Sequence, residues 1–175
     1  RLLSVQDYGI YALLFASVAF VGIITGIFAP AIARFLPEWI AKKNFTAAKK
    51  LVKTALVYNL IIGLLVLATM IFFPGFFSSI FKGEGFLPIY SLLFGLGLVF
   101  NLMAIVLDWA LISLFEQKFR NIARVIYAFF VLALSLIVLQ SGFGLAGVLA
   151  AILAATIILF AITFAKTNSL LFSKH

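Results

Sequence analysis

An uncharged stretch from Tyr8 to Ala33, bounded by Asp7 and Arg34, constrains this chain most strongly. About 20 helical residues cross the roughly 30 Å hydrocarbon core of a bilayer, and this stretch is longer than that. A basic and aromatic segment that includes Trp39 and several lysines follows it directly. The pattern predicts a membrane-spanning helix that arrives at the cytoplasmic surface.

The composition agrees with a membrane protein. Hydrophobic residues make up 66% of the chain and charged residues only 10%, whereas soluble proteins have about 45–50% and 25%. The net charge of +8 comes from cations that cluster in short segments between apolar runs. We therefore assign the positive charge to membrane topology and exclude nucleic acid as a partner.

Five membrane spans follow from the uncharged runs. The last run is about twice as long as one crossing, and the turn-forming segment 140–144 divides it. We predict an all-α, polytopic helix bundle that forms a single transmembrane domain over residues 1–175. The predicted spans are 8–33, 54–78, 87–112, 122–140 and 144–165.

The basic residues predict the orientation of these spans. Eleven of the thirteen Lys and Arg residues fall in segments 34–53, 116–124 and 166–175, which we place in the cytoplasm. The first span then runs inward from outside. Because residue 1 is Arg and no signal peptide opens the chain, we expect one preceding helix and an N-terminal truncation.

The first span carries three further signals. Ser4 and Asp7 have the spacing of a capping box. Small residues recur every three or four positions and favour close helix contact. Pro30 would clash with the carbonyl of Gly26, so we predict a kink over 26–30 that is either a hinge or a tolerated irregularity. The small residues are Ala12, Ala16, Ala19, Gly22, Gly26, Ala29 and Ala33.

The basic segment 34–53 has two interpretations. Pro37 suits the start of a helix, and Trp39 can lie at the level of the lipid headgroups among the lysines. The lysines either anchor the inner end of the bundle or attract an anionic lipid substrate.

Asp108 ends a small and polar stripe that begins with Gly97, Asn101 and Ala104. A carboxylate inside the hydrocarbon layer is costly and normally faces protein or water. Asp108 is therefore either a residue of the inner interface or a buried functional carboxylate. Beyond it, Glu116, Arg120 and Arg124 have the i, i+4 spacing that allows ion pairs along a helix.

Catalytic and cofactor sites are not indicated. Gly142 to Gly147 matches G-x-G-x-x-G, but no acidic residue occurs after Glu116 and both flanks are membrane spans. There is no cysteine, and His175 is the only histidine. We therefore predict no enzyme activity, no metal site and no cofactor.

Three stretches resemble the polysaccharide and oligosaccharide exporters of the superfamily that also contains multidrug and toxin extrusion transporters. They are LSVQDYGIY at 3–11, ARFLPEW at 33–39 with the following 47–56, and EQKFR at 116–120 with the helix over 144–151. The resemblance covers nearly the whole chain and identifies the five spans with helices two to six of that family.

The resemblance implies a flippase that moves polyprenyl-diphosphate-linked oligosaccharide, such as an O-antigen precursor, across the cytoplasmic membrane by alternating access. This chain would form most of one of two lobes. Arg34 would meet a phosphate near the cytoplasmic gate, Asn101 and Asp108 are further candidates for substrate binding, and Gly26 and Pro30 for a hinge. The alternatives are a cation-coupled drug antiporter and a membrane anchor for glycan-assembly enzymes.

Overall fold

The computed structural model describes residues 4–72 and 88–171, and the regular structure in these residues is helical. Five of the helices are long and apolar enough to cross a membrane. This confirms the predicted all-α bundle with five spans. The helices are α1 Val5–Thr25, α2 Phe28–Ala41, α3 Phe45–Phe72, α5 Pro88–Ser113, α6 Gln117–Gln140 and α7 Gly144–Leu171.

Several helix bounds differ from the predicted spans. The predicted span 8–33 is divided between α1 and α2, and α3 begins at Phe45 rather than near 54. The lysine-rich segment is helical because one of its faces is apolar and packs against neighbouring helices. The charged residues mark where the apolar membrane layer ends, but the helix continues beyond that point. Residues 73–78 of the second predicted span lie outside the described residues.

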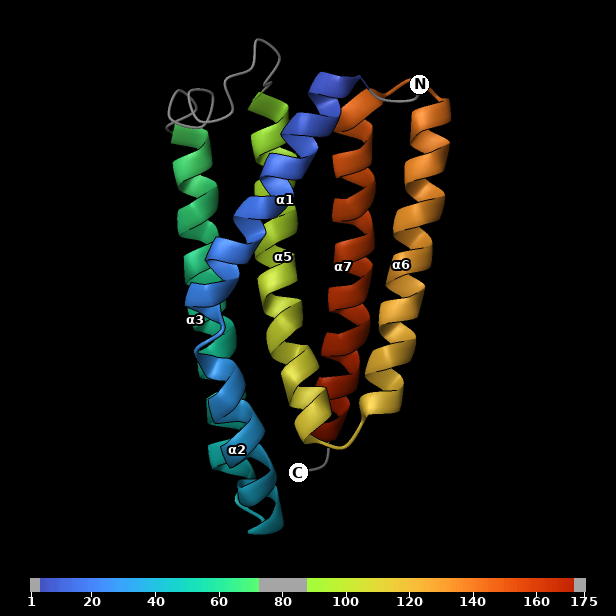
Figure 1. Ribbon diagram of the computed structural model, residues 1–175. Coiled ribbons are helices and arrows are strands. Elements are labelled where there is room, and N and C mark those ends of the chain that lie inside the picture. The colour runs from blue at the N-terminus through green and yellow to red at the C-terminus, as the bar shows by residue number, and fades with distance from the viewer. Residues whose placement is uncertain (1–3, 73–87, 172–175) are drawn as a thin grey trace.

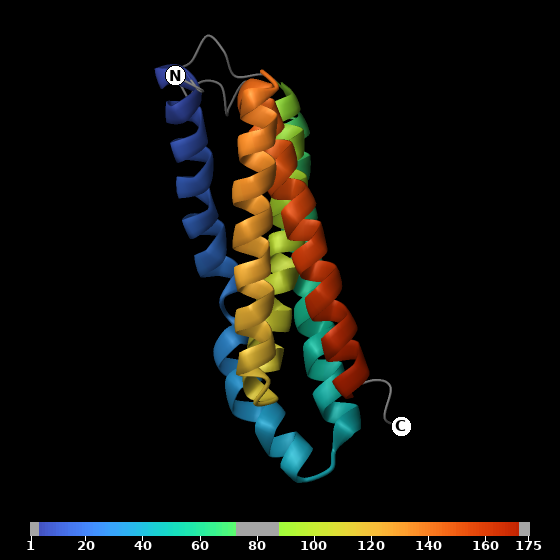
Figure 2. The ribbon, with the colours of Figure 1, turned by 90° about the vertical axis from the view of Figure 1, so that its right-hand side faces the viewer.

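Four helices form a row in the order α3, α5, α7, α6, and α1 and α2 lie across one face of it (Figures 1 and 2). α5 packs against α3 on one side and α7 on the other, whereas α6 packs mainly against α7. The α2–α3 and α5–α6 turns lie at one end of the bundle, which we call the basic end. The α6–α7 turn lies at the opposite end (Figure 1).

The three turns share one hydrogen-bonding pattern. Lys43, Phe115 and Gly142 each have a positive φ just after a helix. In each turn, the next residue donates its N–H to a carbonyl five positions back, as in Asn44 to Trp39 at 2.8 Å. This is the Schellman motif, which satisfies carbonyls that would otherwise be unpaired at the helix end.

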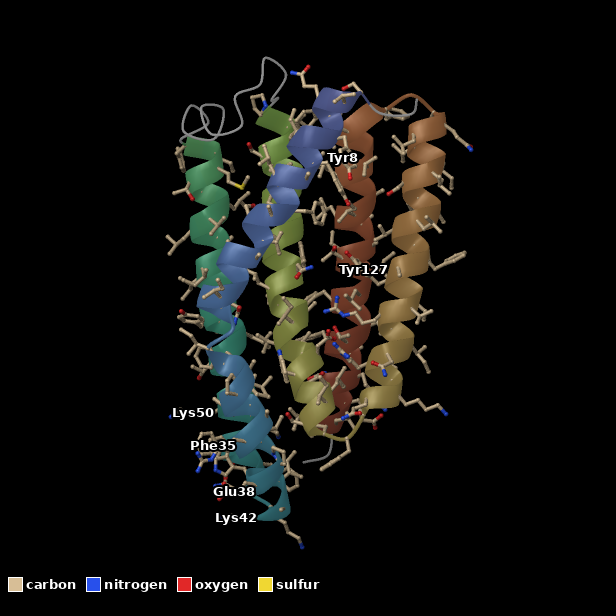
Figure 3. The ribbon with its side chains drawn as sticks, in the orientation of Figure 1. Tyr8, Phe35, Glu38, Lys42, Lys50 and Tyr127 are labelled. Atoms are coloured by element: carbon tan, nitrogen blue, oxygen red, sulfur yellow. The ribbon has the colours of Figure 1, made fainter. Side chains whose placement is uncertain are left out.

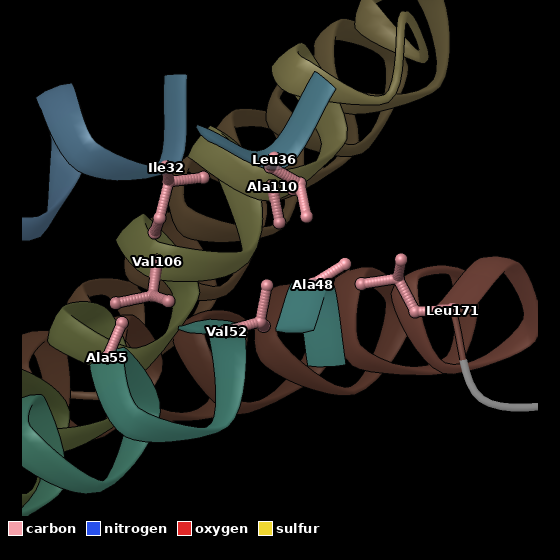
Figure 4. Close-up of a cluster of buried hydrophobic side chains, with 8 residues drawn as sticks. All are labelled: Ile32, Leu36, Ala48, Val52, Ala55, Val106, Ala110 and Leu171. Atoms are coloured by element: carbon pink, nitrogen blue, oxygen red, sulfur yellow. The ribbon is translucent and has the colours of Figure 1, made fainter. Parts of the chain in front are cut away.

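One apolar cluster joins four helices at the basic end (Figure 4). It places Val52 and Ala55 of α3 level with Val106 and Ala110 of α5. Alanines in the cluster allow the helices to approach closely. The buried members are Ile32, Leu36, Ala48, Val52, Ala55, Val106, Ala110 and Leu171.

The start of α1 has the predicted cap. The backbone N–H of Asp7 donates to the Ser4 hydroxyl at 3.0 Å, and that hydroxyl donates to the Asp7 carboxylate at 2.8 Å. The carboxylate thus accepts from the Ser4 side chain rather than from its backbone. The negative charge also suits the positive end of the helix.

The predicted kink is present as an interruption between Thr25 and Phe28. Pro30 has no N–H with which to pair the Gly26 carbonyl, and the Ala29 N–H donates to that carbonyl instead at 3.1 Å. The break therefore keeps a backbone acceptor satisfied. Whether it also moves stays a prediction.

Two expectations for this region were wrong. Pro37 lies inside α2 rather than at a helix start. The small residues Ala12, Ala16 and Ala19 are exposed, so the first half of the stripe makes no helix contact within the described chain. α1 instead packs through other side chains, including Ile10 and Leu14.

Replacing Pro30 should straighten this region. In Pro30→Ala, the new N–H can pair with the Gly26 carbonyl, so we expect α1 and α2 to join into one helix. Spin labels on cysteines placed at Ala12 and Ala41, in a chain that has no native cysteine, should move apart in pulsed electron resonance measurements.

Pro37→Ala is the matched control, because α2 is already continuous through that position. It should leave the distance between the labels unchanged. An unchanged distance in Pro30→Ala as well would contradict the role assigned to the proline.

Candidate functional site

Asp108 on α5 is the charged centre of the bundle, with only 3% of its surface exposed. The Arg124 Nε donates to Asp108 Oδ2 at 2.7 Å, and the Arg124 Nη2 lies 2.5 Å from the same oxygen. The Arg120 Nε lies 3.6 Å from it. One buried carboxylate is thus shared by two arginines of α6, and we call these three residues the ion cluster.

The hairpin of α5 and α6 positions these side chains. Asp108 lies five residues before the end of α5, and Arg120 and Arg124 lie three and seven residues after the start of α6. In an antiparallel helix pair, residues about equally far from the turn are level with one another. α5 and α6 otherwise make fewer contacts with each other than either makes with α7, so the ion cluster is a main direct link between them.

The depth of Asp108 combines the two interpretations that its sequence position left open. The apolar cluster sets residues 106–110 level with 52–55, where the last lysine of α3 gives way to its uncharged part. Asp108 therefore lies near the edge of the apolar layer. It is nevertheless buried among helices rather than exposed at the surface.

The ion cluster is not fully neutralised. Two arginines face one carboxylate, which leaves one positive charge in excess. Within the described residues, Asp108 Oδ1 and Arg120 Nε are buried and have no hydrogen-bond partner. Such groups normally find a partner, so the cluster has both the charge and the hydrogen-bonding capacity to bind an anion that carries a hydroxyl.

A partly open pocket lies between α1, α5, α6 and α7, and none of the three residues of the ion cluster lines it. Its wall is mostly apolar and includes the rings of Phe15 and Phe94. Three polar side chains also line it, Asn101, Tyr127 and Thr156. Tyr127 lies at mid-height of α6, on the side that faces the other helices (Figure 3).

The pocket and the ion cluster follow one another along α5 and α6. Asn101 precedes Asp108 by seven residues, which is about 10 Å along the same helix face. Tyr127 follows Arg124 by three residues, or about 5 Å. The stripe that the sequence indicated on α5 thus leads from an apolar pocket with hydroxyl and amide groups to a cationic site.

Other predicted residues lie apart from this site. Arg34 is exposed on α2, where its guanidinium carbon lies 5.3 Å from the centre of the Phe35 ring, and it does not line the pocket. Gly26 and Pro30 lie at the α1–α2 break and do not line the pocket either.

The predicted i, i+4 pairing of Glu116 with Arg120 is wrong. Glu116 instead pairs with Lys166 of α7 at 3.2 Å. Glu116 lies at the turn before α6, where its side chain reaches α7, while Arg120 and Arg124 extend toward the buried carboxylate. Because Asp108 is buried, leaving its carboxylate unpaired would cost more than leaving the partly exposed Glu116 unpaired, so the arginines pair with Asp108.

The sequence contained a signal for the partners of Asp108 that was not used. A lone carboxylate in an apolar span requires a cation at the same depth. The hairpin turn near Phe115 places residues about 120–124 at that depth. Tyr127 and Thr156, by contrast, have no such signal, because their contribution to a pocket depends on how α6 and α7 are placed.

Comparison with known proteins adds no assignment, because no family model, no curated protein and no solved structure matches this chain. A function therefore has to be argued from the ion cluster, the pocket and the resemblance of the sequence motifs.

Removing the carboxylate of the ion cluster should destabilise the bundle. Asp108→Asn leaves two arginines close together without a counter-ion. We expect the free energy of unfolding to fall by about 1–3 kcal/mol, less than for a fully buried pair because both arginines are about one-third exposed. Unfolding in detergent micelles measures the loss.

Glu38→Gln is the matched control, because it removes the acid of the exposed pair with Lys42. Exposed pairs contribute little to stability, so the free energy of unfolding should change far less than in Asp108→Asn. Equal losses of unfolding free energy in the two variants would show that the ion cluster contributes no more to stability than an exposed ion pair does.

Proposed function

We propose that this chain is part of a flippase that moves polyprenyl-diphosphate-linked oligosaccharide, or a related lipid-linked glycan, across the cytoplasmic membrane by alternating access. The observation that carries the proposal is the ion cluster on the same two helices, α5 and α6, that also line the pocket. The excess positive charge of Arg120 and Arg124 suits a phosphate group. The motif resemblance at the start of α1, within α2 and the start of α3, and after α5 supports the same substrate class.

The neighbouring pocket suits the rest of such a substrate. Its apolar and aromatic wall can contact a lipid chain or the apolar face of a sugar. Asn101, Tyr127 and Thr156 supply amide and hydroxyl groups that can bind sugar hydroxyls. We place the basic end in the cytoplasm, so that the arginines meet the diphosphate on the side where the glycan is assembled.

The break between α1 and α2 fits an alternating-access cycle. α1 makes few contacts with the other helices, whereas α2 is held by the apolar cluster at the basic end. The Gly26–Ile27 junction can therefore let α1 tilt while α2 stays in place. In this proposal α1 opens and closes the pocket.

The ion cluster disfavours the antiporter alternative. A coupling carboxylate has to bind and release a cation or proton during transport. Asp108 already faces two arginines of the same chain, and their charges compete with any incoming cation. The anchor alternative requires no pocket, so loss of transport on changing the pocket or the ion cluster separates it from a flippase.

Arg124 should be required for transport. In proteoliposomes with a fluorescent polyprenyl-diphosphate oligosaccharide, we expect Arg124→Gln to slow translocation about 10- to 100-fold, the loss typical of a charge-assisted hydrogen bond. Lys118→Gln removes a cation that is exposed on the same helix and should leave the rate unchanged.

The double variant Asp108→Asn/Arg124→Gln separates transport from folding. It removes one charge of each sign, so we expect stability close to that of the parent protein but translocation as slow as in Arg124→Gln. Translocation at the parent rate by this folded double variant would contradict the proposed role of Arg124.

A further inference from the structure

The α2–α3 turn projects beyond the rest of the basic end. It extends past the α5–α6 turn in both views (Figures 1 and 2). Val52 of α3 lies in the apolar cluster with Val106 and Ala110, and Phe45 lies seven residues farther out. The turn therefore stands about 10 Å beyond the level at which the uncharged part of α3 begins.

This projection carries cations that no described acidic residue neutralises. At the basic end, Glu38 pairs with Lys42, Glu116 with Lys166 and Asp108 with the two arginines. The hydrogen bond from Lys42 lowers the pKa of Glu38 and keeps that pair ionised. The cations of this end without an acidic partner in the described residues include Lys43, Lys50 and Lys53.

An aromatic stack lies on α2 near these lysines, at the exposed edge of the face that packs against the apolar cluster. The Arg34 guanidinium lies over the Phe35 ring, and Phe35 stacks on Trp39 with ring centres 5.6 Å apart. Ile32 and Leu36 are fully buried, and Trp39 packs partly against the apolar cluster that they form. Figure 3 shows Phe35, Glu38, Lys42 and Lys50 at the basic end of the bundle. Aromatic rings next to cations are typical of the headgroup layer of a membrane.

We propose that the outer face of the α2–α3 hairpin binds the headgroups of anionic phospholipids in the leaflet that it meets. Lys43, Lys50 and Lys53 supply the charge, and Phe35 and Trp39 fix the depth. The site is distinct from the pocket and does not depend on transport. A membrane lipid fits better than a soluble acidic protein, because the cations flank both interfacial rings and the start of the uncharged span.

Fluorescence quenching of Trp39 tests this site directly. The chain has two tryptophans, so Trp109→Phe leaves Trp39 as the single reporter. The full chain is reconstituted in bilayers that contain brominated phosphatidylglycerol or brominated phosphatidylcholine, at low salt. We expect Trp39 to favour the anionic lipid about fivefold, the contribution of one lysine at an anionic surface, or more.

Charge variants test which lysines cause the preference for the anionic lipid. Lys43→Gln/Lys50→Gln/Lys53→Gln should abolish it, and Lys50→Gln alone should reduce it. Lys118→Gln removes one exposed cation of the basic end outside the hairpin and should leave it unchanged. An equal reduction in Lys50→Gln and Lys118→Gln would show diffuse surface charge and overturn the proposal. Equal quenching by both lipids in the parent chain would overturn it as well.

Discussion

The structure depends on a single constraint, which is that a backbone inside a bilayer has to satisfy its own hydrogen bonds. Each described turn ends its helix with a Schellman motif, at Lys43, Phe115 and Gly142. The break at Pro30 keeps the Gly26 carbonyl paired through Ala29. Long helices, short turns and a repaired break all follow from that requirement.

A buried charge in the bundle likewise has to be satisfied within the protein, in this case by ion pairs. Asp108 is buried and tolerated because α6 brings Arg120 and Arg124 to it, and the arrangement leaves one cation in excess. The same stripe of α5 that carries Asp108 also places Asn101 in the pocket. The ion cluster and the polar residues of the pocket thus lie along one path between α5, α6 and α7, which is why we seek the function there.

Sequence reasoning predicted the features that local physics decides. Uncharged length predicted the five spans, Gln140–Gly144 the last turn, Ser4 and Asp7 the cap, and Pro30 the break. It failed where packing decides. Spacing alone suggested that Glu116 pairs along its own helix, but Lys166 of a neighbouring helix lies closer to it.

The small residues of α1 illustrate the limit in another way. Their spacing favours a helix contact, yet Ala12, Ala16 and Ala19 lie on the surface of the described bundle. A periodic pattern indicates which face of a helix is smooth, but not what covers that face. The pocket is of the same kind, because its lining comes from four helices whose relative placement no short motif encodes.

The central claim is that water reaches the path beside the ion cluster, as a transporter requires and an inert anchor does not. The chain has no native cysteine, so Asn101→Cys, Tyr127→Cys and Leu132→Cys each carry one thiol. Treated with a water-soluble maleimide in membranes, Asn101→Cys and Tyr127→Cys, which line the pocket, should react, whereas Leu132→Cys on the exposed apolar face of α6 should not. If the first two are as unreactive as Leu132→Cys, the path is closed to water, and the account is contradicted.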